Sequence, residues 1–161
     1  ALMSAERHIQ EALDGLSTQL QTSIPAQLNT IETATSLTLP DPLEYLVTQD
    51  DVDPQTLGVV YIQVEGVTED DDWITPQTDV HIPLLVSLVA HTGNDNAVTA
   101  DKLARYYARA IANAINATAV DVAGVWYVNR IRTETGPFGA DRYRRRIDVR
   151  AEMHLRTTRI N

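Results

Sequence analysis

Six arginines towards the C-terminal end of the chain could form a surface that binds oxyanions. A guanidinium carries a fixed fork of donors that fits both oxygens of a phosphate or a carboxylate. Four of the arginines stand at even positions of a segment whose odd positions are mostly apolar, so they should share one face of a strand. Two more precede them in a neighbouring segment. The six residues are Arg130, Arg132, Arg142, Arg144, Arg146 and Arg150.

This arginine face has three interpretations. It could contact the phosphates of a nucleic acid, pair with acidic residues of another subunit, or remain solvated. The chain carries a formal net charge of −9, and it contains no recognisable helix-turn-helix or single-strand platform, which disfavours nucleic-acid binding. We therefore favour an ion-pair surface between subunits.

Two acidic clusters could supply oxygen ligands to a divalent cation. The first is Asp50, Asp51 and Asp53, and the second is Asp70, Asp71 and Asp72. Neither has the alternating ligands, central glycine and terminal glutamate of a calcium loop, so solvated loops are the simpler interpretation and weak ion binding is the alternative. Because adjacent carboxylates repel one another in a packed element, we expect the second cluster at an exposed hairpin tip, where it can face the arginines of another copy.

No local motif predicts catalysis or a bound cofactor. The four histidines, at positions 8, 81, 91 and 154, lie in different expected elements, and no two have the helical spacing of a metal pair. There is no cysteine, no glycine-rich phosphate loop and no nucleophile elbow. We expect surface or hydrogen-bonded histidines, no metal, no cofactor and no enzyme activity.

The N-terminal segment has the apolar stripe of an amphipathic helix, with spacings of three and four residues. The stripe consists of Ile9, Leu13, Leu16, Leu20 and Ile24. Pro25 is expected to end or restart this helix, because proline removes a backbone donor in a helix interior. A weaker helical pattern follows with Leu28 and Ile31, and the segment 39–42 reads as an extended turn.

The rest of the chain alternates between strand and helix patterns. Strands are expected over 59–64 and 80–91, a helix over 100–117, and a C-terminal hairpin of strands 120–134 and 142–156 with its turn at 136–139. Pro83 argues for a bulge or an edge position in the second strand. These elements predict one α+β domain over 1–161, with a mostly antiparallel sheet of about four strands and helices packed on one face.

Charge is divided by position along the chain. Residues 1–101 hold 17 acids and one base, a net −16, whereas residues 102–161 hold 12 bases and 5 acids, a net +7. Opposite surfaces of this kind favour contact within a subunit or between copies. No apolar run is long enough to cross a membrane and no leader pattern opens the chain, so we expect a soluble protein that is not secreted.

In this order of elements, the chain resembles the small neck proteins of tailed bacteriophages, in particular the tail terminator, or tail completion, family. The resemblance is one of architecture and covers most of the chain. It includes the helix 5–22, the segment Leu39-Pro40-Asp41-Pro42, the strand 59–64, the acidic stretch Asp70-Asp71-Asp72-Trp73, the strand 80–91, the helix 100–117 and the final hairpin.

The resemblance implies a structural virion protein that forms a hexameric ring at the head-tail junction. Such a ring caps the tail tube, docks on the head connector and lets DNA pass without binding it specifically. The implied location is the neck of the virion, and the host cytoplasm during assembly. The alternatives are a head-completion adaptor or stopper, a nucleic-acid-binding regulator that uses the arginine face, and a hydrolase whose carboxylates meet only in the fold.

Overall fold

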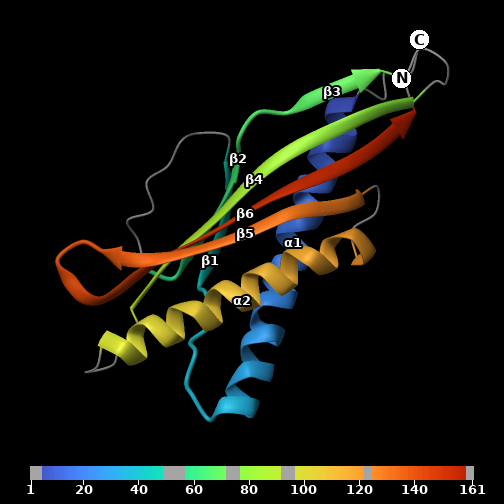
Figure 1. The fold of residues 1–161 in the computed structure, drawn as a ribbon. Helices are drawn as coiled ribbons and strands as arrows, with labels where there is room; N and C mark the ends of the chain where they lie inside the picture. Colours follow the sequence, from blue (N-terminus) through green and yellow to red (C-terminus); the bar gives the residue numbers. More distant parts are fainter. Residues whose placement is uncertain (1–4, 49–56, 72–76, 92–96, 122–124, 159–161) are drawn as a thin grey trace.

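The computed structural model describes residues 5–48, 57–71, 77–91, 97–121 and 125–158. These residues form two long helices and six strands (Figure 1). In chain order the elements are α1 (Ala5–Thr35), β1 (Glu44–Thr48), β2 (Val59–Val64), β3 (Thr68–Asp71), β4 (Gln77–His91), α2 (Ala97–Asp121), β5 (Val125–Phe138) and β6 (Asp141–Thr158). None of the described helices is long and apolar enough to span a membrane.

The strands form one mixed sheet in the order β1-β2-β4-β6-β5, and β3 adds to β4. Only the β1-β2 pair is parallel among the described pairs. The α+β class is therefore confirmed, but the expected strand number was too low because β1 and β3 were missed. β1 shows no alternation of burial, and β3 is a four-residue acidic segment, so neither carries the pattern by which strands are recognised.

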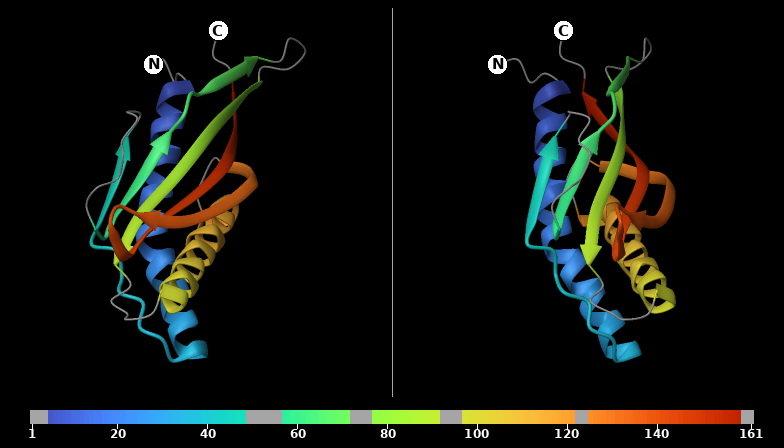
Figure 2. Two further views of the ribbon diagram at one scale, coloured as in Figure 1. Left: turned by 60° about the vertical axis from the view of Figure 1, so that its left-hand side comes forward. Right: turned by 90° about the vertical axis from the view of Figure 1, so that its left-hand side faces the viewer.

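A single core lies between the helices and one face of the sheet. It takes the even positions of β4, the odd positions of β6 and the apolar stripe of α1. Alternation of side chains along a strand places each of these sets on one face. Both helices contribute to this core and pack on one another, and Figure 2 shows them beside the sheet. We call the opposite sheet face the open face.

Pro25 lies inside α1, which continues to Thr35 as one helix. The expected end or restart at Pro25 is therefore wrong. Ile24 and Leu28, on either side of the proline, are fully buried in the core. Burial of the continuous apolar stripe outweighs the missing backbone hydrogen bond, because each buried leucine or isoleucine contributes roughly 1.5–3 kcal/mol.

Pro83 lies in the central strand β4 and not at an edge of the sheet. Its carbonyl oxygen accepts a hydrogen bond from the Glu65 amide at 2.9 Å, where the neighbouring chain leaves β2 and has not yet begun β3. The amide position of a strand residue points to the same side as its carbonyl. The missing donor of Pro83 therefore faces this irregular stretch, and the pairing with β6 is kept.

The C-terminal hairpin is shifted along the chain relative to its expected bounds. β5 begins only at Val125, because α2 runs to Asp121, and it continues through the expected turn to Phe138. Phe138 pairs with Asp141, and Gly139 between them has a φ of 66°, which a side chain would strain. β5 also contains a bulge between Asn129 and Arg132, where Arg130 has a φ of 53°.

Candidate functional site

The arginines of the open face are bonded mainly to acidic residues of the same subunit. The shortest contacts join Arg150 Nη1 to Glu65 Oε1 at 2.6 Å and Arg146 Nε to Asp148 Oδ2 at 3.0 Å. Asp148 also accepts a hydrogen bond from the Ser87 hydroxyl at 2.6 Å. Acidic residues of the range 1–101 therefore neutralise some of the arginines of the range 102–161 within one subunit, as the pair of Glu65 and Arg150 shows.

The remaining candidate arginines lie in different surroundings. Arg130, at the bulge, is 3.5 Å from Glu152 and its side chain is 76% exposed, so this contact is weak. Arg132 is exposed and forms no ion pair with a residue in the described part of the chain. Arg144 is half-buried. Arg142 belongs to β6, and the structure describes its backbone but not its side chain. A role of these residues at a subunit interface stays a prediction.

The second acidic cluster begins within a strand and not at a hairpin tip. Asp70 and Asp71 belong to β3, and Asp70 is exposed. Asp70 stands opposite Asp79 of β4, whose carboxylate contacts Arg156 Nε at 3.0 Å. Asp72 lies outside the described residues, as does the first cluster, Asp50, Asp51 and Asp53.

Three aromatic rings form a stack across the open face, which the sequence analysis did not find. His81 of β4 stands opposite His154 of β6, and their ring centroids are 4.4 Å apart with an interplanar angle of 13°. Tyr127 of β5 stacks on the other side of His154 at 4.1 Å and 15°. Helical spacing cannot reveal this pair, because the register of two strands 73 positions apart brings the histidines together.

The stack also contains a carboxylate and an amide. His81 Nε2 is 3.1 Å from Glu152 Oε2, and His154 Nε2 is 3.0 Å from Asn129 Oδ1. One ligand atom each from His81, Glu152 and His154 lie within 4.8 Å of one another. An imidazole binds a metal in its own ring plane, so two nearly parallel stacked rings do not aim at one ion. The arrangement supports ring packing better than metal coordination.

Lowering the pH is expected to destabilise the subunit through His154. Burial, and then the charge of His81, lower the pKa of His154 below the usual value of a histidine, about 6.5. The unfolded chain therefore takes up the proton at a higher pH than the folded chain, so stability is complete above about pH 6.5 and is lost as the pH falls through the lowered pKa.

Urea unfolding at pH 7.5 and at pH 5.5 would measure this effect. The loss of unfolding free energy on acidification should be smaller in His154→Gln than in the parent chain, with His91→Gln as the matched control. An identical loss in His154→Gln and the parent chain would contradict the role of His154.

β1 presents an apolar edge to the solvent. β1 lies at the end of the strand order and pairs only with β2, so no other described strand pairs with its outer side. Leu46 and Val47 of β1 are 40% and 38% exposed, and Leu43 just before it is 88% exposed. Open edge strands with aliphatic side chains are surfaces on which proteins associate.

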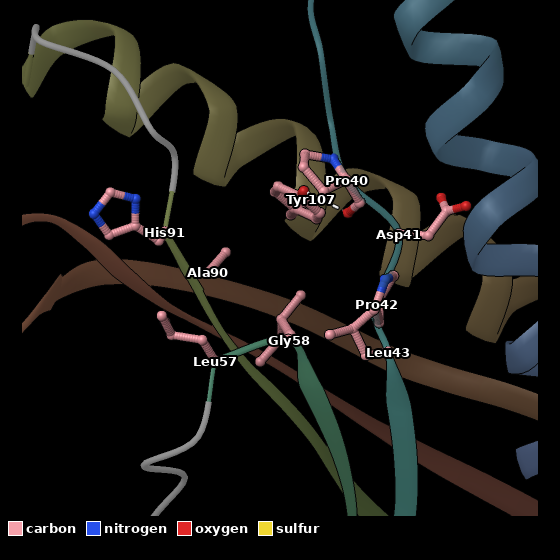
Figure 3. Close-up of a pocket in the computed structure, with 10 residues that line it drawn as sticks. Pro40, Asp41, Pro42, Leu43, Leu57, Gly58, Ala90, His91 and Tyr107 are labelled. Carbon is pink, nitrogen blue, oxygen red and sulfur yellow. Dashed lines mark hydrogen bonds between the residues drawn. The ribbon is translucent and has the colours of Figure 1, made fainter.

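A small apolar pocket lies beside the start of β1 (Figure 3). Its volume is about 210 Å³, and Pro40, Leu43, Leu57 and Tyr107 contribute to its lining. The Tyr107 hydroxyl donates a hydrogen bond to the Pro40 carbonyl at 2.7 Å, and burial raises the pKa of Tyr107. This bond ties the segment before β1 to α2, so the edge strand is held in a fixed position.

Comparison with known proteins finds likeness among solved structures and not at the level of sequence families. No protein-family model matches the sequence, and no curated protein matches it. A chain from a structure entitled "Virion of native gene transfer agent (GTA) particle" is 17% identical with a TM-score of 0.46. The match covers 86% of this chain and 95% of the other chain.

Proposed function

We propose that this protein is a structural subunit of a phage-like virion, where it forms a closed ring at the head-tail junction. The ring caps the tail tube, contacts the head connector and lets DNA pass. The single observation that supports an assembly role best is the apolar edge at Leu43, Leu46 and Val47. Burial of such an edge against another chain releases water from aliphatic surface and completes the backbone ladder.

The charges of the subunit favour assembly over nucleic-acid binding. Contacts with Glu65, Asp148, Glu152 and Asp79 offset much of the positive charge of the open face. The 22 acids against 13 lysines and arginines would repel phosphates at most distances. A ring of such subunits could let DNA slide through without holding it. We propose a structural role and no catalytic activity.

The role of β1 can be tested with Leu43→Lys/Leu46→Lys. Native mass spectrometry and light scattering should find a ring for the parent chain and mainly monomers for the double variant. Loss of two buried leucines at an interface amounts to about 3 kcal/mol, or roughly a hundredfold weaker association. Thr22→Lys adds charge to the exposed side of α1 and should leave the ring intact.

Other outcomes of this experiment would count against the proposal. A parent chain that stays monomeric alone and with tail tubes, and that binds duplex DNA at low salt, would favour the nucleic-acid-binding regulator. A ring that binds the head connector but no tail tube would favour the alternative of an adaptor or stopper.

A further inference from the structure

A polar groove lies between α2 and β5, away from the apolar edge. Its volume is about 300 Å³. Arg105 and Arg109, one helical turn apart on α2, line one side, and Thr133 and Thr135 of β5 line the other. Within the described part of the chain, none of these four side chains has an ion pair or hydrogen bond, so two guanidinium groups and two hydroxyls remain available there.

This set of donors suits a pair of oxyanions. Residues four apart on a helix project from the same face, so both guanidinium groups can reach one acidic segment. Each guanidinium can hold a carboxylate with two parallel hydrogen bonds, and a threonine hydroxyl can donate a further one. A phosphate would satisfy the same donors. The charges elsewhere on the subunit therefore have to decide between a carboxylate and a phosphate as the bound group.

β3 supplies carboxylates that have no counter-charge in the described part of the chain. Glu69 and Asp70 are exposed and form no ion pair with a described residue. Asp70 also stands opposite Asp79, so a further cation near it would relieve repulsion. Figure 1 shows β3 at one end of the sheet and the first half of α2 towards the other end. The acidic strand therefore cannot fill the groove of its own subunit.

We propose that the groove binds the acidic strand β3 of a second copy of this chain. Arg105 and Arg109 bind the carboxylate of Asp70 of the neighbour. Glu69 stands opposite Val80 and points to the other face of β3, where it adds negative charge to the same segment. The contact joins two different surfaces, so each subunit offers both a groove and a strand. Repetition of such a contact gives a ring when the rotation between neighbours closes, as the proposed function requires. This inference rests on the proposed ring assembly and identifies its polar contact. The net charge of −9 disfavours a nucleic acid, because the phosphates of a duplex carry a denser negative charge than a short acidic segment of a second copy does.

Charge reversal in two separate variants tests the contact. Arg105→Glu/Arg109→Glu places acids in the groove, and Glu69→Arg/Asp70→Arg places bases on β3. Each variant alone would bring like charges together, so we expect at least about tenfold weaker ring association for each by light scattering at low salt. Asp14→Arg reverses an exposed charge on α1, away from both proposed contact surfaces, and serves as the control, with association unchanged.

A mixture of the two variants should form rings again. The acidic groove of one variant then meets the basic strand of the other, and the basic groove meets the acidic strand. A single chain with all four substitutions should also assemble, whatever the number of subunits in the ring. Circular dichroism of each variant should match the parent spectrum, since the substituted residues are exposed.

Failure of this inference can be distinguished from failure of the proposed function. If the parent chain forms rings and both double variants form them equally well, the groove contact is wrong and ring assembly stands. If Arg105→Glu/Arg109→Glu keeps the ring but loses binding to short duplex DNA that the parent chain binds, the groove serves phosphates and the inference is overturned. If the parent chain forms no ring at all, the proposed function fails.

Discussion

Replacement of Asp101 by alanine is expected to lower the free energy of unfolding by about 2–3 kcal/mol. Asp101 lies in the first part of α2, and its Oδ1 accepts a 2.8 Å hydrogen bond from Nε of Arg145. The Arg145 side chain is only 6% exposed, whereas Asp101 is 54% exposed. Without the carboxylate, a buried guanidinium would lose the counter-charge that the described residues show at its Nε, and water would replace it only in part.

Adding a substitution of Arg145 to Asp101→Ala distinguishes two contributions to stability. One is the net stabilisation by the ion pair, and the other is the destabilisation that an unpaired buried charge causes. Arg145→Met keeps much of the length of the side chain and removes the charge, so Asp101→Ala/Arg145→Met should recover most of the lost stability. Asp79→Ala is the matched control, because its pair with Arg156 is exposed and should contribute less than about 1 kcal/mol. Urea unfolding at pH 7 measures all three. A loss of under 0.5 kcal/mol in Asp101→Ala would contradict the prediction.

Arg145 also shows what alternation in a sequence can and cannot predict. The polar and apolar positions of residues 142–156 correctly predict a strand with one buried face. Arg145 stands at an odd position of that strand, on the face that packs against the helices, and the pattern gives no partner for it. Its partner is 44 positions earlier, at the start of another element. Only the packing of α2 against β6 brings the two residues together.

The candidate surfaces illustrate the same distinction. The sequence places Arg146 and Arg150 on one strand face, and the register confirms this placement. It also places Asp148 beside Arg146 on that face, but it does not predict that Glu65 is close enough to offset the charge of Arg150. Such contacts depend on which strands become neighbours, and the β4-β6 pairing joins segments separated by a whole helix.

The short edge strands were missed for a different reason. β1 and β3 are short strands that pair with β2 and β4, and neither has side chains that alternate between buried and exposed over enough residues to show in the sequence. An acidic segment such as β3 has low intrinsic strand preference and needs the already formed edge of β4. The two proposed contact surfaces, at β1 and at β3, therefore lie in the elements that the sequence predicts least well.

Replacement of Pro25 by alanine is expected to raise the free energy of unfolding by about 1–2 kcal/mol. A proline in a helix interior costs about 3 kcal/mol relative to alanine, because it removes one backbone hydrogen bond and crowds the preceding turn. Two effects reduce the gain. Proline restricts the unfolded chain by about 0.4–1 kcal/mol, and its half-buried ring loses some contacts on truncation.

Pro25→Gly separates these contributions. Glycine also restores the donor, but it is about 1 kcal/mol less favourable than alanine in a helix, so Pro25→Gly should lie between the parent chain and Pro25→Ala or close to the parent. Urea unfolding with all three chains gives the comparison. If Pro25→Ala is less stable than the parent, the prediction is wrong, and the packing of the proline ring outweighs the regained hydrogen bond. The burial of Leu20, Ile24 and Leu28 alone would then not explain how α1 is held against the core. If Pro25→Ala is more stable, the burial of these three residues explains why α1 can continue through a residue that normally ends a helix.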